Sequence, residues 1–314
     1  MKKVLLASTA LVLSAGVAAA DVAVSGDGRM GIKDDFGSDT DLGFTSRIRI
    51  AFSASGETDA GLAFGGSIRS DNSAGGASGT AGSVFVEGSF GKISMGDVSG
   101  AAEAAVGDIS GVGLTGLGDV NEGIYLSNNT DVDATDFDDD AFSAVRPVAR
   151  YEYSFGAGTV YASISNPDAT GEVGGAPEVD VDVYSIGADY SFGNVTVGAG
   201  YENVDLSGDI SDSIDHWVIG GSAAFGDATV KATYGDSSDL DLTQWGISLD
   251  YVFGATTVTA FYRDVEADLG SGDVDEDGFG LGVAYDLGGG AALKGGYVDF
   301  ADEDAYDFGI SMSF

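Results

Sequence analysis

The 314-residue sequence contains no cysteine, three prolines and a single histidine. Without cysteine the chain can form neither disulfides nor thiolate metal sites. The lone histidine, His216, is a poor basis for a catalytic triad or a zinc site, so we expect no enzymatic activity, no catalytic residues and no bound metal. The scarcity of proline suits strands whose backbone N–H groups all donate to a sheet.

Long apolar runs are missing after residue 20. Lys2 and Lys3 precede an apolar stretch that ends in the small residues Ala18 to Ala20, which is the pattern of a secretory signal and its cleavage site. We therefore expect residues 1–20 to be a signal peptide and residues 21–314 to form one domain. No later stretch reaches the roughly eighteen apolar residues of a membrane-spanning helix.

Basic residues are also scarce. Without Lys2 and Lys3, 11 basic residues would face 51 acidic ones, for a net charge near −40. Such a chain would repel nucleic acid, so no nucleic-acid partner is expected. The 51 glycines, with so few prolines, suit tight turns and crowded strand faces.

A doublet of phenylalanine and glycine recurs along the chain and closes one alternating segment before the next begins. It occurs at Phe90-Gly91, Phe155-Gly156, Phe192-Gly193, Phe225-Gly226 and Phe253-Gly254, with Leu287-Gly288 as a variant. The chain ends at Phe314, in the same phase as these turn aromatics. Short turns on one side and longer acidic loops on the other indicate a series of β-hairpins.

Within the hairpins, apolar and polar residues alternate with period two. Trp245, Ile247, Leu249, Tyr251 and Phe253 form one such apolar row, with aromatic residues at its ends. Aromatics concentrate there at membrane–water interfaces. A soluble β-sandwich, the alternative, gives no reason for that placement.

The pattern predicts an all-β fold, a sixteen-stranded antiparallel transmembrane β-barrel. Closure of the barrel would leave no sheet edge exposed to lipid. The expected strands are centred near Asp27, Ile48, Leu62, Val86, Ser94, Ala149, Ala162, Ile186, Val197, Ile219, Ala232, Ile247, Ala260, Leu281, Leu293 and Ile310.

One connection, from about residue 97 to residue 143, is much longer than the others. Connections of this length are usually functional. Its alanine-rich first part could pack inside the barrel, whereas the acidic run from Asp131 to Asp140 is expected to stay solvated. The candidate acids of an inward-folded part are Glu103, Asp108, Asp119 and Glu122.

Six of the seven arginines lie in strands on either side of this connection and share the parity of the polar face; Arg263 lies elsewhere. We expect them to form a basic wall that faces the acidic loop across a constriction, because rings of charge give pores their selectivity. The alternative is that they are merely solvated. The six are Arg29, Arg47, Arg49, Arg69, Arg146 and Arg150.

Several stretches resemble the sixteen-stranded trimeric general porins of Gram-negative outer membranes, most closely the alphaproteobacterial kind. They are Val24 to Gly31, Gly88 to Asp97, Phe253 to Val258, Tyr285 to Gly290 and the terminal Phe314. The resemblance implies an inward-folded third loop opposite an arginine cluster, a homotrimer in outer-membrane lipid, and passive diffusion of ions and small hydrophilic solutes. Phe314 resembles the residue that the barrel-assembly machinery reads. The chain lacks the Pro-Glu-Phe-like loop tip of enteric porins.

Two acidic runs faintly resemble calcium loops, although neither has the terminal bidentate glutamate at the required spacing. Solvated loops are the favoured interpretation, weak calcium binding the alternative, and no cofactor is expected. The runs are Asp136, Asp138 and Asp140, and Asp273, Asp275 and Asp277.

Two other functions would share part of this pattern. A secreted acidic adhesin or calcium β-solenoid should show nonapeptide repeats, and none occur. A non-conducting structural barrel would need a plugged lumen.

Overall fold

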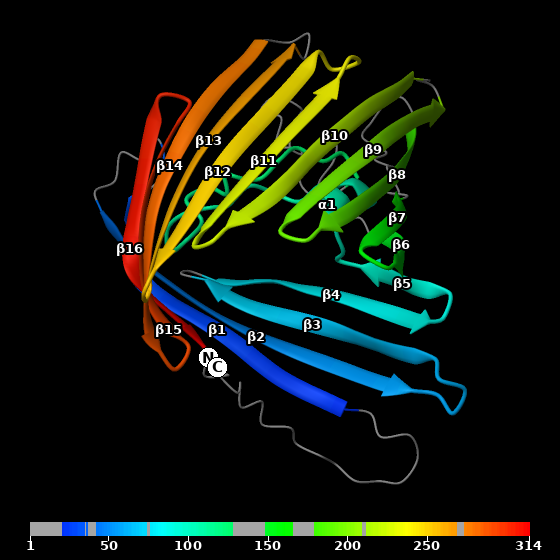
Figure 1. Cartoon of the computed structure of the whole chain (residues 1–314), viewed down its shortest axis with the longest axis horizontal. Coiled ribbons are helices and arrows are strands. Elements are labelled where there is room, and N and C mark those ends of the chain that lie inside the picture. Colours follow the sequence, from blue (N-terminus) through cyan, green and yellow to red (C-terminus); the bar gives the residue numbers. More distant parts are fainter. Residues whose placement is uncertain are drawn as a thin grey trace.

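The computed structural model describes residues 21–34, 36, 42–73, 76–127, 148–165, 179–208, 212–268 and 273–314. The expected signal peptide, residues 1–20, lies outside them. The described part contains sixteen strands and one short helix (Figure 1). They are β1 (Asp21–Asp34), β2 (Gly43–Glu57), β3 (Ala63–Ser73), β4 (Gly76–Gly88), β5 (Gly91–Gly96), α1 (Ala101–Val106), β6 (Val148–Phe155), β7 (Gly158–Ser165), β8 (Val179–Phe192), β9 (Val195–Gly208), β10 (Asp212–Phe225), β11 (Ala228–Ser237), β12 (Leu242–Phe253), β13 (Thr256–Asp268), β14 (Asp273–Gly288), β15 (Ala291–Phe300) and β16 (Glu303–Ser313).

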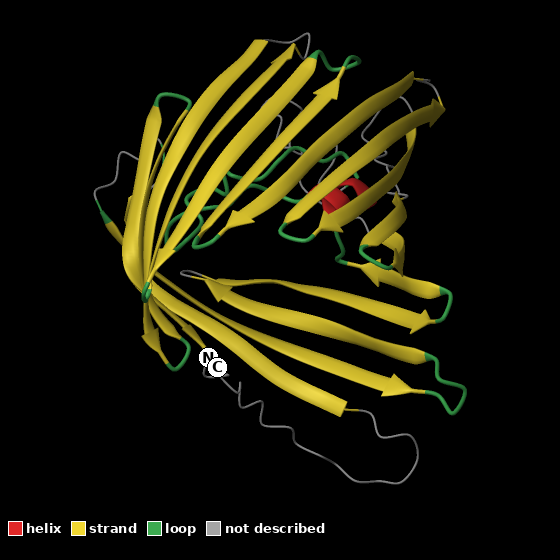
Figure 2. Ribbon diagram, viewed as in Figure 1, coloured by secondary structure: helices red, strands yellow, loops and turns green. Residues whose placement is uncertain are grey.

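Each strand pairs antiparallel with its neighbours in sequence, and β1 pairs with β16 to close the barrel (Figure 2). The prediction of a closed sixteen-stranded barrel is confirmed. One strand centre was wrong, because Leu62 precedes β3. Leu62 belongs to a turn in which its N–H donates to Thr58 Oγ1 at 3.0 Å and its carbonyl accepts from Thr58 N at 2.9 Å.

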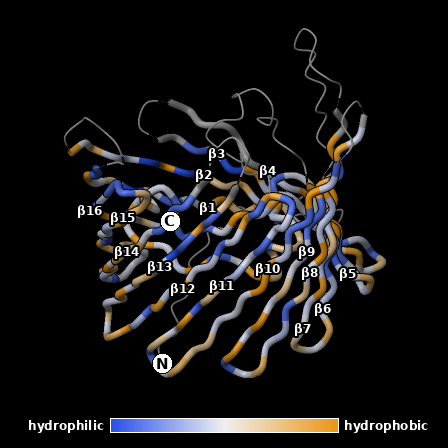
Figure 3. Tube along the Cα trace, turned by 90° about the horizontal axis from the view of Figure 1, so that it is seen from above, coloured by the Kyte–Doolittle hydropathy of each residue, from blue (hydrophilic) through white to orange (hydrophobic). Residues whose placement is uncertain are grey.

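Apolar side chains point out of the barrel and polar ones point in. Along β12, Trp245, Ile247 and Leu249 are exposed, whereas Gln244 and Ser248, at alternate positions, are buried. Hydrophobic and hydrophilic residues are interspersed along the strands in Figure 3. Exposed apolar rows on strand after strand form a far larger apolar surface than soluble proteins tolerate, so the outer face belongs in lipid.

The Phe-Gly doublets form the short turns at one end of the barrel. Gly156, Gly193, Gly226 and Gly254 have φ between 64 and 70°, a left-handed conformation that favours glycine. The chain end lies at this same end, where Phe314 and Gly26 exchange two backbone hydrogen bonds of 2.7 and 2.9 Å. Within the described residues, α1 is the one helix, and at six residues it is too short to cross a membrane.

Candidate functional site

The chain after β5 turns inward and lies on the lumen side of the barrel wall. Helix α1 packs against β7, β8, β9 and β10 (Figures 1 and 2). Its first two backbone N–H groups are held by the wall: Ala101 N donates to Ser163 Oγ and Ala102 N to Ser185 Oγ, both at 2.9 Å. These serines replace the side-chain cap that the helix lacks. We call residues 97–127 the inner loop.

Glycines on the lumen face make room for the inner loop. A Cβ atom on Gly187 would lie 2.4 Å from the Ala101 carbonyl oxygen, and one on Gly200 would lie 2.6 Å from Ala102 Cα. Both distances are below any real contact, so only glycine permits this approach. On seven further glycines a Cβ atom would lie 2.0–2.9 Å from inner-loop residues 105–114: Gly31, Gly198, Gly220, Gly246, Gly282, Gly296 and Gly309. The loop therefore follows a track of glycines from β8 round to β1.

The tip of the inner loop is fixed where the barrel closes. The buried Asp307 of β16 accepts hydrogen bonds from Leu114 N at 2.8 Å, Thr115 N at 2.6 Å and Thr115 Oγ1 at 2.8 Å. Arg29 of β1 donates to Thr115 O at 3.1 Å. A carboxylate that accepts three hydrogen bonds in a buried position holds the tip firmly.

The loop then doubles back along the wall through residues 121–127. Gln244 of β12 binds both backbone groups of Ile124, accepting from its N–H and donating to its carbonyl at 2.8 Å each. The fully buried Glu202 of β9 accepts from Leu126 N and Ser127 N at 2.9 Å and from the Ser127 hydroxyl. His216 Nδ1 lies 2.8 Å from Glu202 and is also fully buried.

The four candidate loop acids come together in this structure. Partial loss of hydration raises the pKa of Glu122 to about 7, and the charges of the other three loop acids add to the rise. Burial likewise raises the pKa of Asp108. Asp119 and Glu122 are exposed side chains of the inner loop.

Of the six candidate arginines, five lie in described residues, all on the lumen face; Arg146 lies outside them. Carboxylates form ion pairs with four of the five. Arg47 contacts Asp27 at 3.2 Å, Arg49 and Arg69 share Asp71 at 2.8 and 2.9 Å, and Arg150 contacts Glu152 at 3.2 Å. The wall is therefore a mixed array rather than a purely basic one.

The arginine wall and the inner loop meet electrostatically at Arg29. Its electrostatic neighbours are Arg47 and Arg49 on the wall, Asp119 on the loop and Asp307 beneath the tip. Arg150 donates to Ser99 O at 2.8 Å, where the loop begins. Charges of both signs thus border the remaining opening.

Two basic residues that the sequence interpretation set aside also touch the loop. Arg263 Nη1 donates to Val120 O at 3.1 Å, and Lys231 Nζ lies 3.4 Å from Asp108 O. Both attract the Asp108 carboxylate. Nothing in the sequence reveals that the loop crosses their strands, β13 and β11. Glu202, Gln244 and Asp307 were missed for the same reason.

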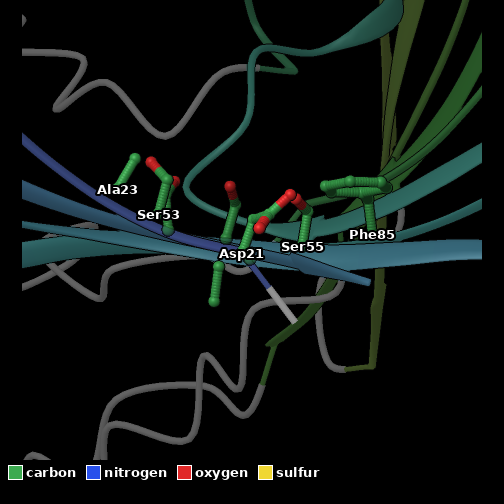
Figure 4. Close-up of a pocket in the computed structure, with 9 residues that line it drawn as sticks. Asp21, Ala23, Ser53, Ser55 and Phe85 are labelled. Atoms are coloured by element: carbon green, nitrogen blue, oxygen red, sulfur yellow. The ribbon is translucent and has the colours of Figure 1, made fainter. Parts of the chain in front are cut away.

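A hollow of about 270 Å³ lies against β1 to β4 (Figure 4). Its one charged lining residue is Asp21. None of the candidate arginines or loop acids lines it. Its lining is Asp21, Ala23, Ser53, Ala54, Ser55, Gly66, Ser67, Ser83 and Phe85.

Among the described residues, no group of three or more His, Cys, Asp and Glu side chains is arranged to hold a metal ion. Asp277 instead accepts a hydrogen bond from the Tyr262 hydroxyl at 2.8 Å. The other acidic run, residues 136–140, lies outside the described part.

The barrel has an apolar outer face and a polar lumen, and the inner loop is hydrogen-bonded to the lumen wall. These features define a membrane channel of the β-barrel class. The comparisons with known proteins agree. A profile described as Gram-negative porin matches residues 7–305. The chain is 38% identical over 320 residues to a porin of Rhodobacter capsulatus, covering 94% of this chain and all of the relative.

The chain belongs to the Gram-negative porin family. A porin structure refined at 1.8 Å resolution is 35% identical, with a TM-score of 0.73 over 93% of this chain and all of that one. A mutant of Rhodopseudomonas blastica porin, at 24% identity and a TM-score of 0.65, shares the fold over the same 93%. The protein is thus an outer-membrane channel for passive diffusion of solutes, not an adhesin or a closed structural barrel.

Proposed function

We propose that the inner loop and the arginine wall together form the constriction that sets conductance and gives a weak cation preference. The observation that carries the proposal is the double attachment of the loop, at its tip by Asp307 and along its return by Glu202 and Gln244. The solutes are ions and small hydrophilic molecules. Four loop acids and an arginine wall largely paired with carboxylates favour cations at this point.

The absence of cysteine from the chain allows a direct test. In the variant Asp119→Cys, the single cysteine lies exposed on the inner loop and should react with a charged thiol reagent. The reaction should reduce the single-channel current in both polarities. A cysteine at Glu57, at the turn end of β2, should react with little effect on current. Equal block at both positions, or none at Asp119, would contradict the proposal.

We further propose a homotrimer. β5, β6 and β7 have six, eight and eight residues, fewer than the roughly nine to eleven that a tilted strand needs to cross the hydrocarbon layer. A second copy of the chain, packed against the short strands β5 to β7, would shield this part of the barrel from lipid. Native mass spectrometry in mild detergent should give three copies; a monomer would contradict the proposal.

We also propose that conduction needs no cofactor and that any calcium bound by the acidic runs is weak. A chelator should then leave the single-channel conductance unchanged, and a large fall would show that a cation is required.

A further inference from the structure

We propose that His216 is a positioning residue for the inner loop. While its imidazole is neutral it holds residues 121–127 of the loop against the barrel wall, and in acid it releases them. The inference deepens the proposed function and depends on the inner loop forming the constriction. It starts from the one histidine of the chain, which is fully buried between Glu202 and Gln244.

The hydrogen bonds fix which nitrogen carries the proton. Gln244 cannot turn its amide around, because its oxygen accepts from Ile124 N and its nitrogen donates to Ile124 O. The same Gln244 nitrogen lies 3.3 Å from His216 Nε2, so Nε2 must accept. Nδ1 then carries the hydrogen and donates to Glu202. This is the neutral imidazole.

The surroundings leave little freedom to adjust. On β11, between the strands of His216 and Gln244, a Cβ atom at Gly235 would lie 2.9 Å from His216 Nε2 and 2.8 Å from Gln244 Nε2. The titratable groups around the cluster are Glu202 on β9 and, on the loop, Tyr125, whose hydroxyl donates to Gly107 O. Asp108, which accepts from Gly123 N, and Glu103 act on Tyr125 from the same loop. Glu202 is bound at Nδ1 and Tyr125 at Gly107 O, so neither takes the place of Gln244 as the hydrogen-bond partner of Nε2.

If Nε2 of His216 gains a proton, it and the Gln244 amide nitrogen are both donors, and the hydrogen bond between them is lost. Rotation of the Gln244 amide would relieve this, but it would break both hydrogen bonds to Ile124 and leave its backbone N–H and carbonyl without partners, which is unfavourable. Because the barrel wall lies behind this part of the loop, a released segment can move only into the lumen. Acid should therefore produce closures.

The test is single-channel recording in symmetrical salt at pH 7.5 and at pH 5. The wild type should be open and quiet at pH 7.5 and should show frequent closures and a lower mean conductance at pH 5. His216→Gln and His216→Asn, which keep a donor and an acceptor without a titrating group, should stay open at both values. Glu202→Gln should already flicker at pH 7.5, because an acceptor of Ser127 N is weakened.

Two controls separate this effect from others. Asp205→Asn removes one charge from β9 on the outward face and should keep the wild-type acid response. Recording in a Glu122→Gln background removes the loop acid that titrates near neutral pH. Unchanged acid closures in both His216 variants would overturn the proposal, and so would failure of both to assemble as heat-modifiable barrels. If the thiol reagent blocks the Asp119→Cys variant but the wild type does not respond to acid, this inference alone is refuted and the proposed constriction stands.

Discussion

Glu122 is the single residue whose charge should follow pH most closely in the neutral range. Burial and the neighbouring acids raise its pKa to about 7, so the side chain is mostly protonated below about pH 6 and mostly ionised above about pH 8. Wild-type cation preference should therefore rise between about pH 6 and pH 8. Glu122→Gln should flatten that rise and lower cation preference at pH 8, measured by reversal potentials in a salt gradient.

The matched control is Glu57→Gln, the same change at the turn end of β2. It should leave the pH dependence of the reversal potential intact. An unaltered rise in the Glu122 variant would mean that this carboxylate does not face the ion path.

Residues differ in how well the sequence identified them. Arg47 and Arg49 were predictable because strand parity alone places them in the lumen. Asp307 and Glu202 have the same parity, yet their role depends on hydrogen bonds to a loop that has no periodicity to reveal its course. The importance of the lone His216 was likewise invisible, since its neighbours Glu202 and Gln244 come from other strands.

At the scale of elements, the seating of α1 on glycines is the feature most open to perturbation. Gly187→Leu should displace the helix, because even one added carbon would lie 2.7 Å from Ala105 Cβ. The displaced helix would narrow the lumen and lower the single-channel conductance, by an amount large enough to see in a conductance histogram. Gly43→Leu, on the lumen face of β2 with open space around its Cβ position, should have much less effect. Equal conductance in the two variants would refute the glycine track.

The pairing of β1 with β16 closes the barrel, and Phe314 extends it by two backbone hydrogen bonds to Gly26. Deleting Phe314 removes its two backbone hydrogen bonds to Gly26, about 1–3 kcal/mol together, and the ring that covers Gly26. The amount of heat-modifiable barrel in the outer membrane should fall. Phe314→Leu keeps the backbone hydrogen bonds, so the amount of heat-modifiable barrel should fall less in this variant. Wild-type amounts after the deletion would exclude this role.

For the whole molecule, alternation and turn aromatics were sufficient to predict the closed barrel, since each strand repeats one physical rule. The same rule misplaced β3, where the Thr58 to Leu62 turn contains an apolar residue that looks like a strand position. The course of the inner loop could not be predicted, because its attachments link residues more than a hundred positions apart, such as Ile124 and Gln244.

In the proposed constriction, the arginine wall faces the inner loop across the narrowest part of the channel. The double variant Arg47→Ala/Arg49→Ala removes two positive charges and leaves the carboxylates of Asp27 and Asp71 less compensated. The screening length at physiological salt is about 8 Å, so charges at the narrowing act strongly while distant ones are damped. The control removes two positive charges near the turn end, by Lys92→Ala/Lys294→Ala.

Reversal potentials in a salt gradient, recorded with single-channel conductance, decide the matter. The arginine variant should be clearly more cation-selective than the wild type, with equal or higher conductance because bulk is lost, whereas the lysine variant should shift much less. A reversal potential that matches the wild type in the arginine variant but moves in the lysine variant would contradict the constriction described here.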